Sequence, residues 1–387
     1  MDEGGEERGQ ESVLQQCEHP EARDNTLRMS CSLDEPFVLA KFESKKKYKK
    51  EQMFANDISY QPSTGRRLVL FKTSIAELVE TVTESGKTEA NIKLVQKCPV
   101  GGILYKVIEL KLNVFLVYAY GNPVCVISGD RVLMKRRGEF PSGNLINQFT
   151  VKRDFVYYSG YQDQAVAINP HHNLFVRKVN ISEIRRAVDE YAEELPPGQI
   201  FLCKSASAFY PDEDVLWVID NLQILVRIDS EDFKNYTRMY LPNMDFSANW
   251  NAMTGCSKGL IFAAQINPPA SPGNYATQLI ALYSREVTPQ LLTIQTYPNA
   301  QPVIGFKVLE TPAKTYLLVK RKLLVIDVML IQQDKLQLLE KFTYCEPIKH
   351  IAEPLESMLI IPVGPDNYKI YFGTKGVQIV QLKFAVD

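Results

Sequence analysis

The stretch VIGFKVLETPAKTYLLVKRKLLVIDVMLIQQDKLQLLEKF (303–342) decides the fold of this chain. It contains four short runs rich in β-branched and large apolar residues, joined by short polar connections, and this pattern is typical of strands and turns. The spacing predicts four antiparallel strands. The segment Leu-Leu-Val-Ile at 323–326 is apolar on both sides, as a strand buried between two sheets requires. The four runs are Val303 to Leu309, Thr315 to Lys320, Leu323 to Val328 and Leu336 to Phe342.

The same pattern recurs toward the N-terminus. The runs Ile103 to Leu110, Val114 to Tyr120, Val124 to Ser128 and Val132 to Met134 are separated by Asn113, by Gly121-Asn122-Pro123 and by Gly129-Asp130. From residue 54 onward, the chain can be divided near 98, 143, 199, 243, 299 and 347. This gives seven units of about 40 to 55 residues, the usual length of one propeller blade.

A radial arrangement explains why such units would repeat, because stacked four-stranded sheets bury both faces and leave only short edges. Read together, the units resemble the β-propeller superfamily of WD40-like repeats. The nearest segments are Leu216-Trp217-Val218-Ile219-Asp220 and Leu323-Leu324-Val325-Ile326-Asp327, in which an apolar strand ends on an acidic residue. No unit opens with Gly-His or closes with Trp-Asp, and the resemblance carries over no functional residue. We therefore expect an all-β fold, a β-propeller with seven four-stranded blades.

One segment has helical instead of strand periodicity. Apolar residues recur at Ile181, Ile184, Val188, Tyr191 and Leu195, which predicts an amphipathic helix over 181–195, inserted between two blades. Asn180 and Glu183 resemble a capping pair, and Pro196-Pro197-Gly198 ends the pattern. The apolar stripe can pack on the propeller itself. Alternatively, Ile184, Val188 and Tyr191 form a partner-contact surface.

The N-terminal part of the chain divides into two segments. Residues 1–35 are acidic and poor in large apolar residues, so we expect them to be disordered. Residues 36–53 combine a weakly alternating strand, Phe37 to Phe42, with a basic run, and residues 54–387 form the propeller. We expect Phe37 to Phe42 to close the ring by pairing with the region Val377 to Phe384. The basic run, Lys45, Lys46, Lys47, Lys49 and Lys50, is a solvated linker, a nuclear-import signal or an anion-binding arm.

Composition restricts the functional classes. With 387 residues, 45% hydrophobic, 23% charged and a formal net charge of −1, the chain is not a strongly basic nucleic-acid binder. Its seven cysteines form no Cys-x-x-Cys motif, the polar and acidic first 35 residues contain no apolar region of a secretion signal, and no apolar run approaches the length of a membrane span. We therefore expect a soluble protein of the cytoplasm, the nucleus or both, with reduced thiols.

No motif indicates catalysis, a cofactor or a metal. His171-His172 lies in a predicted turn without a cysteine at ligand spacing. Cys125 and Cys203 lie in apolar runs, where a thiol is usually an inert core residue. Gly101-Gly102 and Gly373-Thr374-Lys375-Gly376 lie between strands and do not fit a phosphate-binding loop. We therefore expect no catalytic, cofactor-binding or metal-binding residue.

Three functions remain open at this point. The leading hypothesis is a non-catalytic scaffold or adaptor that binds other proteins within an intracellular complex. A nucleic-acid-associated or chromatin-associated propeller would use the lysine run, Arg66-Arg67 and Lys135-Arg136-Arg137, with a steep salt dependence. A propeller enzyme would need acids or histidines that converge at the mouth of the central channel.

Overall fold

The computed structural model describes most of the predicted propeller and two short pieces before it. The described residues are 29–33, 38–42, 55–119, 124–135, 148–152, 154–162, 173–190, 199–204, 206–220, 224–229, 231, 233, 235–241, 248–266, 276–298, 300–321, 325–333, 335–343, 358–364, 367–374 and 376–386. The lysine run, Tyr191 and the four histidines lie outside these ranges.

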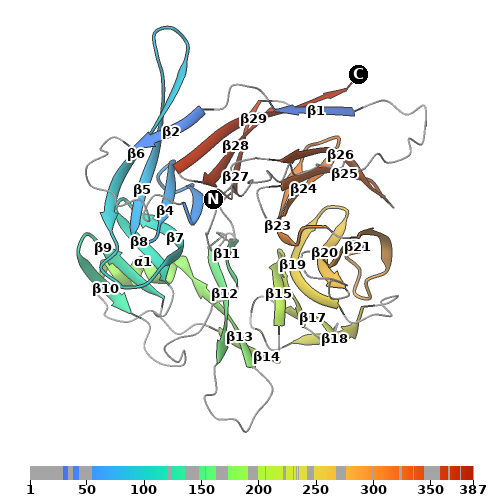
Figure 1. Cartoon of the computed structure of the whole chain (residues 1–387). Helices are drawn as coiled ribbons and strands as arrows, with labels where there is room; N and C mark the ends of the chain where they lie inside the picture. The colour runs from blue at the N-terminus through green and yellow to red at the C-terminus, as the bar shows by residue number, and fades with distance from the viewer. Residues whose placement is uncertain are drawn as a thin grey trace, which may run out of the picture.

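The strands form six hydrogen-bonded sheets arranged in a ring (Figure 1). Five sheets have four strands each and correspond to blades two to six. The nine-stranded sixth sheet consists of two further four-stranded units joined through one short strand, β2. The ring therefore has seven blades, as the sequence repeat predicts.

Within each blade, consecutive strands pair antiparallel from the first strand to the last. The first three blades are β3 (Asp57–Gln61), β4 (Arg66–Phe71), β5 (Ser74–Val82), β6 (Thr88–Lys97); β7 (Leu104–Lys111), β8 (Val114–Ala119), β9 (Cys125–Ser128), β10 (Arg131–Lys135); and β11 (Gln148–Lys152), β12 (Phe155–Gln162), β13 (Asn173–Asn180), β14 (Gln199–Lys204). The next three are β15 (Ala206–Pro211), β16 (Val215–Asp220), β17 (Ile224–Asp229), β18 (Tyr236–Tyr240); β19 (Ala248–Cys256), β20 (Gly259–Ile266), β21 (Thr277–Tyr283), β22 (Leu291–Tyr297); and β23 (Val303–Glu310), β24 (Thr315–Arg321), β25 (Val325–Ile331), β26 (Leu336–Thr343).

Blade seven is made from both ends of the chain. It contains β27 (Met358–Gly364), β28 (Asn367–Thr374), β29 (Gly376–Val386) and, as its outer strand, β1 (Met29–Leu33). Strand β2 (Val38–Phe42) pairs antiparallel with the beginning of β29, with Val38 opposite Ile379, and parallel with β6 of blade one, with Lys41 opposite Asn91. Figure 1 shows β1 and β2, in blue, beside β29, in red. The predicted pairing of Phe37 to Phe42 with the C-terminal strand is confirmed.

Strand β1 corrects the expected boundary of the N-terminal segment. Met29 pairs with Val386 and Leu33 pairs with Leu382, so the folded part of the chain begins before the expected boundary at residue 35. The strand MSCSL has only five residues and few large side chains, so its sequence gives a weak strand signal. The partner strand β29 supplies the missing hydrogen bonds and holds β1 in the sheet.

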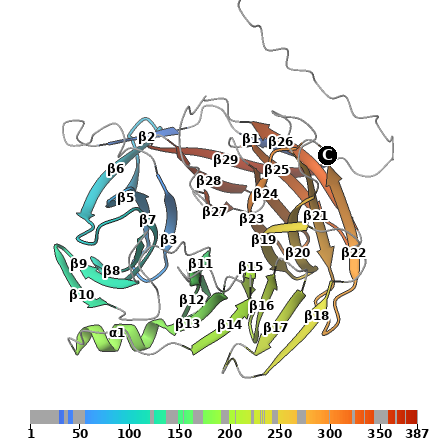
Figure 2. The same ribbon diagram turned by 60° about the horizontal axis from the view of Figure 1, so that its bottom comes forward.

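The helix α1 (Ile181–Asp189) begins where the capping pattern predicts, since Asn180 Oδ1 accepts the N–H of Ser182 at 2.9 Å. The helix does not lie between two blades, as the spacing suggested. It connects β13 to β14 within blade three, because the run after Pro196-Pro197-Gly198 returns to pair with β13, with Leu174 opposite Cys203. Figure 2 shows α1 at the edge of the ring between β10 and β13.

The apolar stripe of α1 packs on the propeller. Ile184 is fully buried and Val188 is 7% exposed, in a cluster with Leu110 and Val114 of blade two. Arg185 also donates to the carbonyl of Leu110 at 3.0 Å. Ile184 and Val188 therefore have no exposed surface for the partner contact considered above, and Tyr191 lies outside the described residues.

The core lies between neighbouring blades and not within a central layer. Separate clusters of buried side chains join blades one and two, two and three, five and six, six and seven, and seven and one, and a large cluster around Trp217 and Phe262 joins blades four and five. All seven residues of β25 are buried, as expected for a strand with neighbours on both faces. Stacking of blades thus provides the hydrophobic burial that a single sheet lacks.

The connections from the first to the second strand of each blade gather at one end of the ring, which we call the helix face because α1 lies there. Contacts between neighbouring blades confirm this: Ser63 donates to the carbonyl of Glu109 at 2.9 Å, and Glu310 accepts the N–H of Ser257. Lys152 and Asp212 form a similar contact between blades three and four. Residues far apart in the sequence therefore meet on this face.

Gly259 provides a test of blade packing. A Cβ atom at Gly259 would lie 2.1 Å from the carbonyl oxygen of Tyr283, whereas a Cβ at Gly305 would meet nothing within 4 Å. We expect Gly259→Ala to lower the free energy of unfolding by about 1–3 kcal/mol, the usual cost of overpacking. Gly305→Ala is the control and should have a much smaller effect. Urea denaturation measures both, and equal midpoints for the two variants would contradict the packing.

Ring closure can be tested by truncation. A chain that begins at residue 29 keeps β1 and β2, and a chain that begins at residue 43 lacks both. We expect the shorter chain to unfold at a clearly lower urea concentration, because the outer edge of β29 and the link to β6 are lost. Equal denaturation midpoints for the two chains would show that the N-terminal strands do not stabilise the ring.

Candidate functional site

A cavity of about 590 Å³ opens at the junction of blades three and four. This volume lies in the range of sites that hold small ligands or peptide side chains. Its lining combines aromatic and aliphatic side chains with many charged groups: Lys152, Phe155, Tyr157, Lys178, Asp212, Glu213, Asp214, Val215, Arg227, Asp229 and Glu231. Five carboxylates against three cations leave this lining with a formal charge of −2.

Strand alternation decides which side chains of blade three face the cavity. Side chains of successive strand residues point to opposite faces of the sheet. Val156 and Val179 pack in the cluster toward blade two. Their neighbours Phe155 and Lys178 consequently face blade four and line the cavity. Blade three thus turns an aliphatic face toward blade two and a partly charged face toward blade four.

Lys178 forms the buried part of the cavity wall. Its side chain lies over the ring of Phe155, with 4.1 Å from Nζ to the ring centre, and it donates to the carbonyl oxygen of Glu231 at 3.3 Å. Lys178 is 7% exposed, and the carbonyl and the aromatic face contribute to the stabilisation of its charge. The centre of the Phe233 ring lies 6.0 Å from the same Nζ.

Phe233 adopts an uncommon backbone conformation in the same wall. Its φ angle is +59°, which is unfavourable for a bulky residue. Two contacts hold it there: its N–H donates to the carbonyl of Asp229 at 3.1 Å, and its ring is buried in the cluster of blades four and five. The connection between β17 and β18 therefore has a fixed shape at the cavity.

Asp212 links three consecutive blades. It accepts the N–H of Glu213 at 2.8 Å, lies 3.4 Å from Lys152 Nζ of blade three, and pairs with Arg285 of blade five. Burial raises the pKa of Asp212, but the Glu213 N–H and the two cations outweigh it and hold the pKa below its usual value. Asp212 therefore fixes the relative positions of these blades as a carboxylate.

The rim of the cavity is acidic. Glu213, Asp214 and Glu231 are exposed, and Asp229 is partly exposed. Asp229 Oδ1 accepts the N–H of Glu231 at 2.9 Å, which shapes the β17–β18 connection. Among the residues that the structure describes, the carboxylates of Asp214 and Glu231 have no ion-pair partner.

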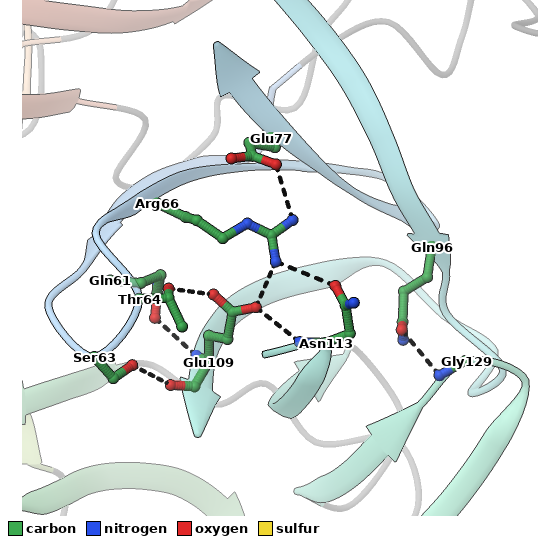
Figure 3. Close-up of polar contacts among 9 residues, drawn as sticks. All are labelled: Gln61, Ser63, Thr64, Arg66, Glu77, Gln96, Glu109, Asn113 and Gly129. Carbon is green, nitrogen blue, oxygen red and sulfur yellow. Dashed lines mark hydrogen bonds and ion pairs between the residues drawn. The ribbon is translucent and has the colours of Figure 1, made fainter. Parts of the chain in front are cut away.

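A second polar cluster, at the junction of blades one and two, is structural (Figure 3). The side chain of Glu109 is fully buried and lies 2.6 Å from Arg66. It also accepts from the hydroxyl of Thr64 at 2.5 Å and from the N–H of Asn113 at 3.0 Å. Arg66 makes a further ion pair with Glu77 at 3.0 Å. This cluster locks two neighbouring blades together at the helix face and leaves Glu109 no access to a ligand.

The basic pair Arg66-Arg67 does not support the nucleic-acid hypothesis, because both side chains form ion pairs within the fold. Arg67 lies 3.0 Å from Glu80, which also pairs with Lys369 and accepts from Tyr371 at the junction of blades seven and one. Burial raises the pKa of Glu80, and these partners together lower it below its usual value. The lysine run and Arg136-Arg137 lie outside the described residues.

The environment of the described thiols keeps them protonated and therefore unreactive. Burial raises the pKa of Cys98 and Cys256, and it raises the pKa of Cys125 to about 12. In the described part of the chain, no three His, Cys, Asp or Glu side chains gather as potential metal ligands. No described helix has the length and apolar character needed to cross a membrane.

The cavity residues do not form a recognisable motif in the sequence. Asp212-Glu213-Asp214 and Asp229 with Glu231 each lie at the end of a strand, where acidic residues are ordinary turn formers. A signal was nevertheless present. Both groups belong to connections of blade four that lie on the same face, because the first and third strands of a blade run in the same direction.

No family model matches the chain, and no curated protein matches it. Solved structures match it over nearly its whole length. The N-terminal domain of Nup159 has a TM-score of 0.57 at 10% identity, with 93% of this chain and 97% of that chain covered. The WD40 domain of coronin from Toxoplasma gondii has a TM-score of 0.55 at 8% identity, with 93% and 87% covered.

A chain in the mitotic checkpoint complex has a TM-score of 0.53 at 10% identity, with 98% of this chain and 99% of that chain covered. At such low identity, these likenesses concern the fold alone. They confirm the resemblance to WD40-like propellers that the strand pattern predicts.

The ion pairs of Asp212 predict a pH dependence of stability. Because the folded-state pKa lies below the ordinary value of 3.8, the stabilisation is complete above that value and is lost as the pH falls through the folded-state pKa. We expect Asp212→Asn to lower the free energy of unfolding at pH 7 by about 1.5–3 kcal/mol, the usual contribution of hydrogen bonds to charged groups.

The difference between Asp212→Asn and the wild type should shrink at acidic pH, because protonation removes the same charge from the wild type. Urea denaturation at pH 7, 5, 4 and 3 measures this difference in the free energy of unfolding. Asp130→Asn, at an exposed turn, serves as the control. A difference that stays constant over this pH range would contradict the assigned role of Asp212.

Proposed function

We propose that this propeller is a non-catalytic protein–protein interaction scaffold, a subunit of an intracellular complex in the cytoplasm or nucleus. The supporting observation is the position of its exposed apolar side chains. Tyr60 at 47%, Leu112 at 66% and Val363 at 47% exposure belong to the first strands, or the turns that follow them, in blades one, two and seven. We call these three residues the rim cluster.

The rim cluster lies on the helix face, toward the ends of first strands or in the turns that follow them. The blades seven, one and two are consecutive in the ring, and their first strands surround its centre (Figure 2). Apolar residues gathered on one rim favour contact with another protein, whereas single exposed apolar residues are ordinary. Val82, Tyr236 and Val287 are also exposed at the helix-face ends of their blades and extend the apolar character outward.

The thiols and the lysine run support the proposed location. Cys98, Cys125 and Cys256 are free, which suits a reducing compartment. Lys45, Lys46, Lys47, Lys49 and Lys50 would serve as a nuclear-import signal in this proposal.

The function can be tested by purification of the tagged chain from the cells that express it, at physiological salt. We expect stoichiometric protein partners with the wild type and their loss with Tyr60→Ser/Leu112→Ser, which removes the apolar contact but keeps the fold. Ile294→Ser/Leu338→Ser is the matched control, because these residues are exposed at 36% and 45% on outer strands. A wild-type chain that purifies alone, or a rim variant that keeps every partner, would contradict the proposal.

A further inference from the structure

The cavity between blades three and four contains charged groups that the fold does not use. The cations are already engaged: Lys152 pairs with Asp212, Lys178 donates to the Glu231 carbonyl, and the guanidinium of Arg227 lies 5.9 Å from the centre of the Trp217 ring. Within the described chain, the carboxylates of Asp214 and Glu231 have no ion pair, and the carboxylate of Asp229 accepts the backbone N–H of Glu231 but has no ion pair. With five carboxylates and three cations, the lining as a whole favours a cationic ligand.

Trp217 lies directly behind the cavity wall. It shares one face of β16 with Val215, which lines the cavity, and it stands opposite Arg227 on β17, which also lines it. The side chain of Trp217 is 2% exposed, and its Nε1 has no acceptor among the described residues. A buried N–H without an acceptor is costly, so a peptide carbonyl or a water molecule that reached it from the cavity side of β16 would stabilise it.

The two observations together specify a ligand. Unpaired carboxylates at the rim favour a cation, and the buried N–H beside the wall favours an acceptor. Phe155 and Val215 provide an apolar surface for an aliphatic stem. An arginine or lysine within a peptide supplies all three: a cationic head, a hydrocarbon stem and backbone carbonyls.

We propose that this cavity binds an arginine or lysine side chain, with its flanking backbone, from a partner protein. The proposal rests on the scaffold function and specifies one contact of it. The cationic head lies at Asp214, Asp229 and Glu231, and the stem lies along Phe155 and Val215.

Trp217 permits a direct test, because the chain has only one other tryptophan, Trp250. In the Trp250→Phe variant, the fluorescence of Trp217 reports on the cavity. The probe is the acetylated and amidated peptide GSRSG, and GSESG is its anionic counterpart. We expect saturable fluorescence changes with GSRSG and none with GSESG. Isothermal titration calorimetry of the wild-type chain with the same peptides gives the affinity without the Trp250 substitution.

The charge assignment is tested by Asp214→Asn/Asp229→Asn/Glu231→Gln. We expect this variant to bind GSRSG about tenfold more weakly. The matched control is Glu84→Gln/Asp130→Asn/Glu286→Gln, which removes the same charge from exposed positions outside the cavity lining and should keep the wild-type affinity. Circular dichroism confirms that both variants are folded.

Three results would overturn the inference: no binding of GSRSG by the wild type, equal affinity for GSESG, or equal weakening in both triple variants. None of these results bears on the rim cluster, because the peptide titration requires no partner protein. Conversely, a chain that binds GSRSG but purifies alone would contradict the scaffold function and leave the cavity assignment standing.

Discussion

The structure depends on burial of both faces of every blade. A strand such as β25, in which all seven residues are buried, is stable only if another blade lies on each side of its sheet. In a closed ring, blades seven and one must also bury their facing surfaces against each other. There, Tyr371 and Ile379 of blade seven pack with Phe71 and Ile92 of blade one. Strand β2 completes this junction by pairing with both β29 and β6, and β1 pairs with the end of β29, so N-terminal and C-terminal strands are held in one sheet.

Polar contacts then fix how neighbouring blades are aligned. Hydrophobic packing is non-directional, whereas a buried ion pair is satisfied only in one geometry. Glu109 with Arg66 aligns blades one and two, Glu80 aligns blades seven and one, and Asp212 aligns blades three to five. All three groups depend on their charged partners, because an unpaired buried charge is strongly destabilising. The helix face thus has a defined shape on which loops can present exposed residues.

The sequence predicts the strands well where one blade follows another without interruption. In blades two and six, alternating runs and turns such as Asn113, with a φ of +61°, mark nearly every strand. The predicted boundary between two blades near residue 199 was wrong. Helix α1 interrupts the regular spacing of the strands, so β14 (Gln199–Lys204) looks like the first strand of the next blade instead of the last strand of blade three. The prediction also failed at Met29–Leu33, whose pairing depends on a strand more than 300 residues away. The cavity could not be predicted because its residues meet only after the blades close.

The junction of blades three and four has a buried cation beside a small apolar contact. Among the side chains that the structure describes, blade three contributes only Tyr157 to the buried cluster of blades four and five, with Phe155 partly buried beside it. Lys178 occupies a position on β13 where a stable junction would favour an aliphatic residue. Places where a sequence departs from purely apolar packing are commonly functional sites. The cavity, the unsatisfied indole and the acidic rim all lie at this junction, which is why we assign recognition to it.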